Sequence, residues 1–309
     1  MSAIEKIKMV YGRVIIIKIA IITLICLVFS GCTIIALEIY SGVFERVEGD
    51  GPFDSWLAEY PREEVWFYSG KNRLQGFIYG GENNKGLVVI SPGIYSYADE
   101  YDRIIRYLVD KGWRIFSYNM TGVDKSEGDS MRGLSQAVID LDAALTYIEN
   151  TGTFSGLPVM LAGFSMGGYA VCAVLNYDHR VDAVVSFAGF NSTRDVMKEQ
   201  ATAKIGGLYY LISPQVWALE KQLFEDIAKL TAVDGINKSL IPVMIVLCSD
   251  DDIVPVNTIS IYAHRKNIIN PHVEIVYLDG EDAFGHYFKN YPKEALYERV
   301  NHFLENSGQ

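Results

Sequence analysis

A serine between two glycines has the clearest chemical potential in this chain. The stretch AGFSMGGYA follows an apolar run and precedes a helix-like run. A serine on a sharp turn from strand to helix exposes its hydroxyl, and glycines two residues away on either side avoid a clash. Ser165 is therefore predicted to be a nucleophile, flanked by Gly163 and Gly167. The alternative interpretation is a tight glycine-rich turn that packs a helix on a strand.

A serine nucleophile needs a base and an acid. His286, in the stretch DGEDAFGHYF, is the one histidine of five that lies in a loop just after the last predicted strand. It is predicted to be the base, because it completes the chain order Ser–Asp–His. The acid is sought among Asp250, Asp251 and Asp252, which directly follow an earlier apolar strand. One member of this trio could instead cap the start of a following helix.

The oxyanion of an acyl-transfer intermediate needs two backbone N–H groups aimed at one point. Met166, just after the nucleophile, is predicted to supply one of them. The other is predicted to come from Ile94, because Gly93 lets the backbone turn in the loop SPGIYSYADEY. The alternative is a Pro-Gly turn with no catalytic role.

Strands and helices alternate along most of the chain. Apolar runs predict strands at 64–69, 73–80, 86–91, 113–119, 157–164, 181–190, 242–249 and 272–279. Helical spacing of apolar residues lies between most of them, which predicts an α/β fold with a mostly parallel sheet and helices on both faces. The first two strands are predicted to form an antiparallel hairpin at one edge. Residues 191–240 contain only helix-like runs and are predicted to be a helical insertion.

From about Glu64 to the C-terminus the chain resembles the α/β-hydrolase superfamily, within its monoacylglycerol-lipase-like and serine-aminopeptidase-like branch. The resemblance is carried by SPGIYSYADEYDRIIRYLVDKGWRIFSYNMTGVDKSEGD, GFSMGGYA, IPVMIVLCSDDDIVP and GEDAFGH. It implies the α/β-hydrolase fold and an acid four residues before Pro255, which is Asp251. It also places the family's glycine-histidine pair on Gly285 and His286, and it implies that the insertion is a small lid that covers the site and shapes an acyl pocket.

Two positions depart from the pattern of this family. Pro92–Gly93 stands where the oxyanion loop usually has His-Gly, and Phe164 precedes the nucleophile where the family often has histidine. Neither change removes a catalytic group, but both leave the substrate class open.

The predicted reaction is hydrolysis of an ester, thioester or amide bond by Ser165, His286 and Asp251 through an acyl-enzyme. The expected partner is a small-molecule acyl substrate, such as a lipid-like ester or a peptide. No metal or organic cofactor is expected, because the mechanism needs none and no metal-ligand spacing is present. Two alternatives use the same fold: a catalytically silent binding protein, and an acyltransferase with the same triad.

The N-terminus predicts a membrane anchor. Ile19–Leu37 carries no charge, and the apolar stretch 14–37 is long enough to cross a bilayer as a helix. Basic residues precede the uncharged run, the last of them inside the stretch 14–37: Lys6, Lys8, Arg13 and Lys18, against the single acidic residue Glu5. The positive-inside rule then predicts that 1–13 is cytoplasmic and that the body is extracytoplasmic. A linker is expected over 38–63 and the hydrolase domain over 64–309.

Two other interpretations of the N-terminus remain open. The stretch FSGC ending at Cys32 resembles a lipoprotein processing site, and an ordinary cleaved signal peptide would share the same composition. All three interpretations place the body outside the cytoplasm.

Charge excludes one class of partner. The chain of 309 residues has a formal net charge of −11. Since its first 18 residues carry about +3, the remainder is strongly acidic, which argues against nucleic acid as a partner. Cys172 and Cys248 are expected to be small buried hydrophobic residues without a disulfide.

Overall fold

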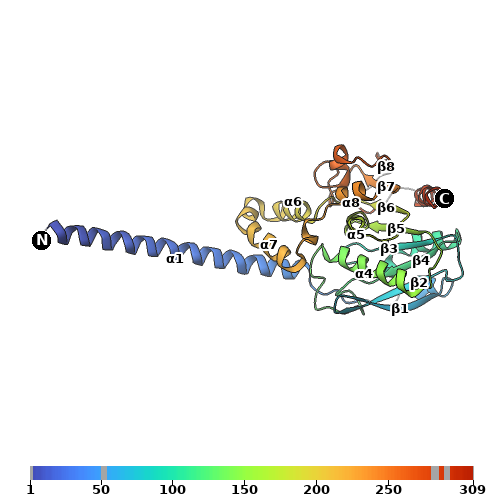
Figure 1. The fold of residues 1–309 in the computed structure, drawn as a ribbon, viewed down its shortest axis with the longest axis horizontal. Helices are drawn as coiled ribbons and strands as arrows, with labels where there is room; N and C mark the ends of the chain where they lie inside the picture. Colours follow the sequence, from blue (N-terminus) through green and yellow to red (C-terminus); the bar gives the residue numbers. More distant parts are fainter. Residues whose placement is uncertain (1–2, 50–53, 280–284, 289–292, 309) are drawn as a thin grey trace.

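The computed structural model describes residues 3–49, 54–279, 285–288 and 293–308, with the backbone alone for 3–14, 54 and 55. Figure 1 shows a long helix, α1 (Ala3–Val43), that projects away from a body built around one twisted sheet.

The sheet has eight strands in the order β1-β2-β4-β3-β5-β6-β7-β8. They are β1 (Arg62–Ser69), β2 (Asn72–Tyr79), β3 (Leu87–Ser91), β4 (Arg114–Tyr118), β5 (Val159–Phe164), β6 (Ala183–Phe187), β7 (Val243–Cys248) and β8 (Val273–Leu278). The hairpin β1–β2 is antiparallel and β2 pairs antiparallel with β4, while all later pairs are parallel. The predicted mostly parallel sheet with an antiparallel leading hairpin is confirmed.

Helices cover both faces of the sheet, as predicted. On one face lie α4 (Gln136–Thr151), α5 (Met166–Ala173) and α8 (Ala232–Ser239), and on the other lie α3 (Asp102–Asp110) and α9 (Lys293–Ser307). The central strands read as continuous apolar runs because each face of the sheet buries every second side chain. In β3, for example, Val89 packs with the first group of helices and Val88 with the second.

The predicted insertion divides into two parts. α6 (Thr193–Ile205) and α7 (Tyr209–Phe224) form a helical pair beyond the sheet (Figure 1), and this pair is called the lid below. α8 instead belongs to the body, since Ala232 and Ile236 are fully buried in the core beside α5. Of the expected insertion 191–240, only α6 and α7 therefore lie outside the body, where a lid is expected.

Short helical turns complete the body and the lid. They are α2 (Asp54–Leu57) and the 3₁₀ turns η1 (Ala98–Tyr101), η2 (Val174–Asn176), η3 (Gly206–Leu208), η4 (Ile227–Lys229) and η5 (Ile261–Asn267). Cys172 and Cys248 are buried and unpaired.

The helix α1 is longer than the predicted span. It continues six residues past Leu37, so the predicted linker begins as helix and becomes irregular only after Val43. The segment Ile15–Val43 is long and apolar enough to cross a membrane, and most of its surface is not covered by the body.

Candidate functional site

The turn between β5 and α5 holds Ser165 in a strained conformation. Its backbone has φ 55° and ψ −110°, a region that residues with a Cβ atom rarely adopt. Two hydrogen bonds hold the turn: Ser165 N–H donates to the carbonyl oxygen of Phe187 at 2.8 Å, and Tyr169 N–H donates to that of Ser165 at 3.0 Å. The strain is therefore stabilised by the strand and helix on either side.

The two flanking glycines are required by close backbone contacts. A Cβ atom on Gly163 would lie 2.1 Å from the carbonyl oxygen of Gly167. A Cβ atom on Gly167 would lie 2.0 Å from the carbonyl oxygen of Ser91 on the neighbouring strand β3. No side chain fits at either position without moving the backbone. The Gly-x-Ser-x-Gly spacing thus has the steric origin expected from the sequence.

Asp251 and His286 form a buried pair. Nδ1 of His286 lies 2.8 Å from Oδ2 of Asp251, and both side chains are at least 95% buried. The other carboxylate oxygen of Asp251 accepts the backbone N–H groups of Ile253 at 3.0 Å and Val254 at 2.7 Å. Because a carboxylate only accepts, Nδ1 of His286 carries the proton and Nε2 is left as the acceptor.

The three adjacent aspartates have different surroundings. Asp250 accepts from Gly285 N–H at 2.9 Å and from the Cys248 thiol at 2.8 Å, and these bonds lower the pKa of its carboxyl. Asp252 is exposed. Asp250 thus holds the backbone beside His286, while Asp251 holds the ring. Residues 280–284 of the GEDAFGH stretch lie outside the described residues.

The loop after β3 lies against the turn of Ser165. A Cβ atom on Gly93 would be 3.7 Å from the Cβ atom of Ser165. The Gly93 N–H donates to the hydroxyl of Tyr101 at 2.7 Å, while the next residue, the predicted donor Ile94, lines the cavity described below. Met166 is the first residue of α5, and N–H groups in the first turn of a helix have no partner within the helix.

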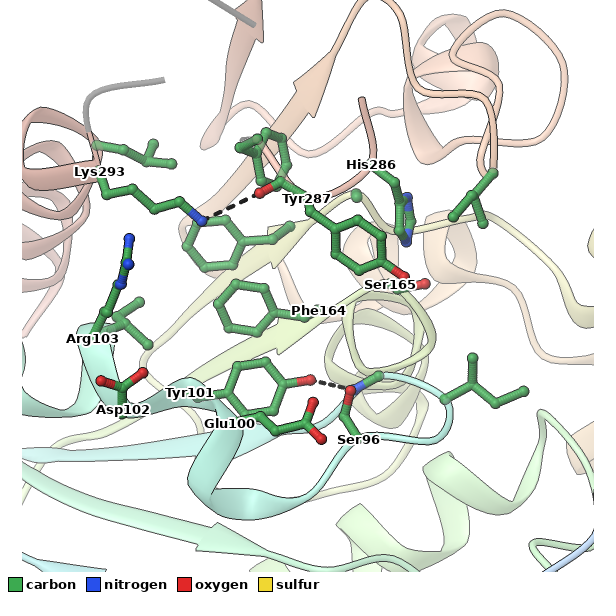
Figure 2. A pocket seen from close by; sticks show the side chains of 18 of the residues that line it. Ser96, Glu100, Tyr101, Asp102, Arg103, Phe164, Ser165, His286, Tyr287 and Lys293 are labelled. Carbon is green, nitrogen blue, oxygen red and sulfur yellow. Dashed lines mark hydrogen bonds between the residues drawn. The ribbon is translucent and has the colours of Figure 1, made fainter. Parts of the chain in front are cut away.

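One cavity of about 500 Å³ is lined by Ser165, His286 and Ile94, whereas Asp251 and Met166 are not among its lining residues. Its lining residues are Gly93, Ile94, Tyr95, Ser96, Glu100, Tyr101, Asp102, Arg103, Ile104, Phe164, Ser165, Phe187, Ala188, Ile253, His286, Tyr287, Phe288, Lys293, Leu296 and Tyr297. Figure 2 shows the imidazole of His286 next to Ser165 at one end of this cavity. The charged side chains of Asp102, Arg103 and Lys293 lie at the other end.

Stacked aromatic rings form the wall between the two ends. The ring of Phe164 lies 4.7 Å from that of Tyr101 and 4.4 Å from that of Phe187, the latter pair almost parallel. Burial raises the pKa of Tyr101 to about 12, so its hydroxyl is protonated at neutral pH. Phe164 therefore places an apolar surface beside the nucleophile, at the position where the resembling family often has histidine.

The lid does not line this cavity. Residues 191–240, all of which the structure describes, contribute none of its lining, so the expectation that the insertion shapes the acyl pocket does not hold for this cavity. The walls come instead from the loop and helix turns at 93–104, from the ends of β5 and β6, from Ile253, and from 286–288 and 293–297. The lid reaches the site indirectly: the amide of Gln200 donates to the carbonyl oxygen of Ile253 at 2.7 Å, two residues after Asp251.

Sequence reasoning missed Tyr101. Its hydroxyl accepts a hydrogen bond from the Gly93 N–H and its ring packs at a tilt against Phe164, yet it is separated from both in the chain. In the sequence Tyr101 is the first residue of an apolar repeat with helical spacing, and no local pattern distinguishes it from a core residue. A second histidine with acidic partners, His179, lies away from the cavity. Its Nε2 is 2.8 Å from Oδ1 of Asp142, and its Nδ1 is 3.2 Å from Oε1 of Glu149.

Comparisons with known proteins agree with this architecture. The family model described as serine aminopeptidase, S33, matches residues 82–234, which include the loop after β3 and the Ser165 turn. The chain is an α/β hydrolase. Its family match and fold make it a serine hydrolase, and among curated proteins no match is found.

Solved structures of this fold include an esterase from Pyrococcus furiosus, with 18% identity, a TM-score of 0.66, and coverage of 86% of this chain and 99% of that one. The protein Est1E from Butyrivibrio proteoclasticus, with bound ferulic acid, shares 17% identity at a TM-score of 0.61. The match covers 79% of this chain and 98% of that one. An acylaminoacyl peptidase from Pyrococcus horikoshii shares 16% identity at a TM-score of 0.60, covering 84% of this hydrolase and 44% of that chain. At these identities the likeness concerns the fold.

Proposed function

We propose that this α/β hydrolase cleaves an ester, thioester or amide bond with Ser165, His286 and Asp251 as its catalytic triad. The observation that carries the proposal is the 2.8 Å bond between His286 Nδ1 and Asp251 beside a serine held on a strained turn. His286 Nε2 accepts the Ser165 hydroxyl proton as Oγ attacks the substrate carbonyl carbon. Asp251 holds the ring in the required tautomer and stabilises the imidazolium.

The N–H groups of Ile94 and Met166 are proposed to bind the oxyanion that forms on the substrate oxygen. The positive end of α5 adds to this stabilisation, because the first turn of a helix favours negative charge. His286 then returns the proton to the leaving group, and an acyl-enzyme remains on Ser165. Water, activated by His286 in the same way, releases the acid product and restores the serine.

The cavity supports a substrate with an apolar acyl or aromatic part. The packed rings of Tyr101, Phe164 and Phe187 line the way from Ser165 to the charged end. At that end burial and the nearby Arg103 lower the pKa of Lys293. Glu100 lies nearer to Tyr101 and Ser96 (Figure 2), and burial raises the pKa of its carboxyl. Charges of both signs lie at the charged end, so the apolar wall is the feature on which the proposal for the substrate rests.

We further propose that α1 anchors the enzyme in the cell membrane as a single span, with the body on the extracytoplasmic side. The span Ile15–Val43 and the basic residues before it support this topology. The lipoprotein alternative would cleave before Cys32. That residue lies inside α1 and packs against the cluster of Ala36, Tyr209 and Ile212, so cleavage would remove most of a continuous helix.

A fluorophosphonate probe separates the hydrolase from a catalytically silent protein of the same fold. The purified full chain should be labelled at Ser165, and prior treatment with the probe should abolish hydrolysis of p-nitrophenyl esters. An intact chain that does not react would favour the silent binding protein. Acyl transfer is distinguished by product analysis, since a transferase would give acylated acceptor in place of free acid.

A further inference from the structure

The lid packs directly against α1. Ala36 of α1 is 2% exposed and forms a small apolar cluster with Tyr209 and Ile212 at the start of α7, with Cys32 and Ile205 at its edge. Four residues beyond Ala36, the Tyr40 hydroxyl donates to the buried carboxylate of Glu220, further along α7. Figure 1 shows α7 alongside the end of α1, next to the body. The lid is thus in contact with the helix that is proposed to span the membrane.

With α1 as the proposed span, the contact would lie at the depth of the outer part of the bilayer. At 1.5 Å per residue the uncharged run Ile19–Leu37 is about 28 Å long, close to the thickness of a hydrocarbon core. Its outer end is marked by the exposed Glu38. Cys32 lies about 7 Å inside that end and Ala36 lies near it. A segment that packs against Cys32 and Ala36 therefore lies at the same depth as the outer boundary of the hydrocarbon core.

That segment exposes large apolar side chains. The residues 205–212, called the lid tip here, connect α6 to α7 through η3. Within it Leu208 is 64% exposed, Tyr210 is 58% exposed and Leu211 is 62% exposed. The exposed Lys204 lies at its edge. A single exposed leucine is ordinary, but these three exposed residues lie next in sequence to Tyr209 and Ile212, which pack on the apolar span.

We propose that the lid tip is a second membrane contact, with Leu208, Tyr210 and Leu211 inserted into the extracytoplasmic leaflet. This inference rests on the proposed span of α1. Leucine side chains would enter the outer hydrocarbon, the tyrosine would lie at the level of the lipid headgroups, and Lys204 would extend to the phosphates. The occupant of this surface is a lipid bilayer and not a partner protein.

This second contact would determine how the body sits on the membrane. A single helix leaves the body free to rotate about the exit of the span, whereas a lid tip in the leaflet fixes its orientation. It also connects the membrane to the site, because Gln200 of α6 is bonded to the carbonyl oxygen of Ile253 beside Asp251. The enzyme is thereby suited to esters that reside in the bilayer.

Site-specific quenching by spin-labelled lipids tests the lid tip. The full chain is reconstituted in phosphatidylcholine and phosphatidylglycerol vesicles and labelled with bimane at one cysteine at a time. The native Cys26 reports on the span in a Cys32→Ala chain. Leu211→Cys reports on the lid tip in a chain with Cys26→Ala and Cys32→Ala. Ile269→Cys, in the same background, is the matched control, because Ile269 is 75% exposed and lies outside the lid, before the edge strand β8.

A nitroxide placed near the top of the lipid chains should quench the label at residue 211 about threefold more than the label at residue 269. A nitroxide near the chain ends should quench Cys26 most strongly. If Cys26 is quenched but residue 211 behaves like residue 269, the lid tip does not enter the leaflet and the span still stands. If Cys26 is not quenched, the span is wrong, and the inference fails with it.

A functional arm uses Leu208→Glu with Leu211→Glu. Hydrolysis of an ester dissolved in the vesicles should fall about tenfold, because each buried charge opposes insertion. Hydrolysis of p-nitrophenyl acetate in solution should not change, which shows that the triad is intact. Equal rates on the vesicle substrate would overturn the inference. Loss of the soluble activity as well would also contradict it, since the lid tip would then support the site itself.

Discussion

The hydroxyl of Tyr95 donates a 2.6 Å hydrogen bond to the carbonyl oxygen of Val43, the last residue of α1. Tyr95 follows Ile94 in the loop after β3, and its backbone has a φ of 63°, in the left-handed region. Two residues on, the hydroxyl of Tyr97 donates to the carbonyl oxygen of Glu48 at 2.7 Å. The proposed oxyanion loop is thus attached to the segment by which the chain leaves α1.

Tyr95→Phe removes one of these attachments. Since the lost hydrogen bond contributes about 1 kcal/mol and acts on an oxyanion donor, kcat should fall about fivefold with little change in KM. Tyr68→Phe is the matched control, because Tyr68 is exposed on β1. Steady-state kinetics on a soluble p-nitrophenyl ester measure the effect. An unchanged kcat, or a change confined to KM, would show that the attachment does not position the donor.

The aspartate trio gives a second comparison. Asp251→Asn should lower kcat by about 10⁴-fold, because the amide favours the wrong tautomer of His286. Asp252→Asn should have little effect, since Asp252 is exposed. Asp250→Asn should cost less than Asp251→Asn because Asp250 contacts the backbone at Gly285 and not the ring. If Asp250→Asn lowered kcat more than Asp251→Asn, the acid would be Asp250 and not Asp251.

Glu220 makes the contact between the lid and α1 depend on pH. Burial raises the pKa of its carboxyl above the ordinary value. Its contribution to stability is therefore fully present when the group is protonated, below the pKa of the unfolded chain, and is lost as the pH rises through the raised pKa. Glu220→Gln should remove this loss, so its Tm should exceed that of the parent increasingly as the pH rises from 4 to 8.

The control for Glu220 is Glu82→Gln, at an exposed carboxylate in the loop before β3. Differential scanning fluorimetry in one detergent provides the Tm values. A Tm difference between Glu220→Gln and the parent that is the same at every pH would mean that the carboxyl does not titrate differently on folding.

The anchor can be tested by mass. An uncleaved span predicts a chain near 34.6 kDa after extraction from membranes. A lipoprotein would begin at Cys32 and be about 3 kDa lighter before acylation. Cys32→Ala should therefore leave the size unchanged, and accumulation of a larger precursor would instead identify a processed lipoprotein.

Local patterns were sufficient to predict the sheet and the turn of Ser165. The strands are continuous apolar runs, and Gly163 and Gly167 are required by contacts of their own backbone with their immediate surroundings. The choice of Asp251 among three aspartates came from a resemblance, through the spacing to Pro255, because the three are equivalent in composition. Only the path of the loop directs one of them to His286.

The contacts that the sequence did not predict join segments far apart in the chain. Tyr40 and Glu220 are separated by 180 residues, and neither lies in a pattern that indicates the other. Tyr95 and Val43 are likewise 52 residues apart. The hydrophobicity of α1 predicted a membrane helix, but it contained no signal that the end of the helix would pack on the lid.

The kinetics of Ser165→Ala, of His286→Ala and of the double variant test the central claim most directly. When two residues act as one catalytic unit, removing either of them abolishes the function of both. Each single change should therefore lower kcat by about 10⁵-fold or more, and the double change should lower kcat little further. All three proteins should keep the Tm of the parent within a few degrees. If Ser165→Ala retained half of the activity of the parent, or if the two losses multiplied in the double variant, Ser165 and His286 would not form a catalytic unit.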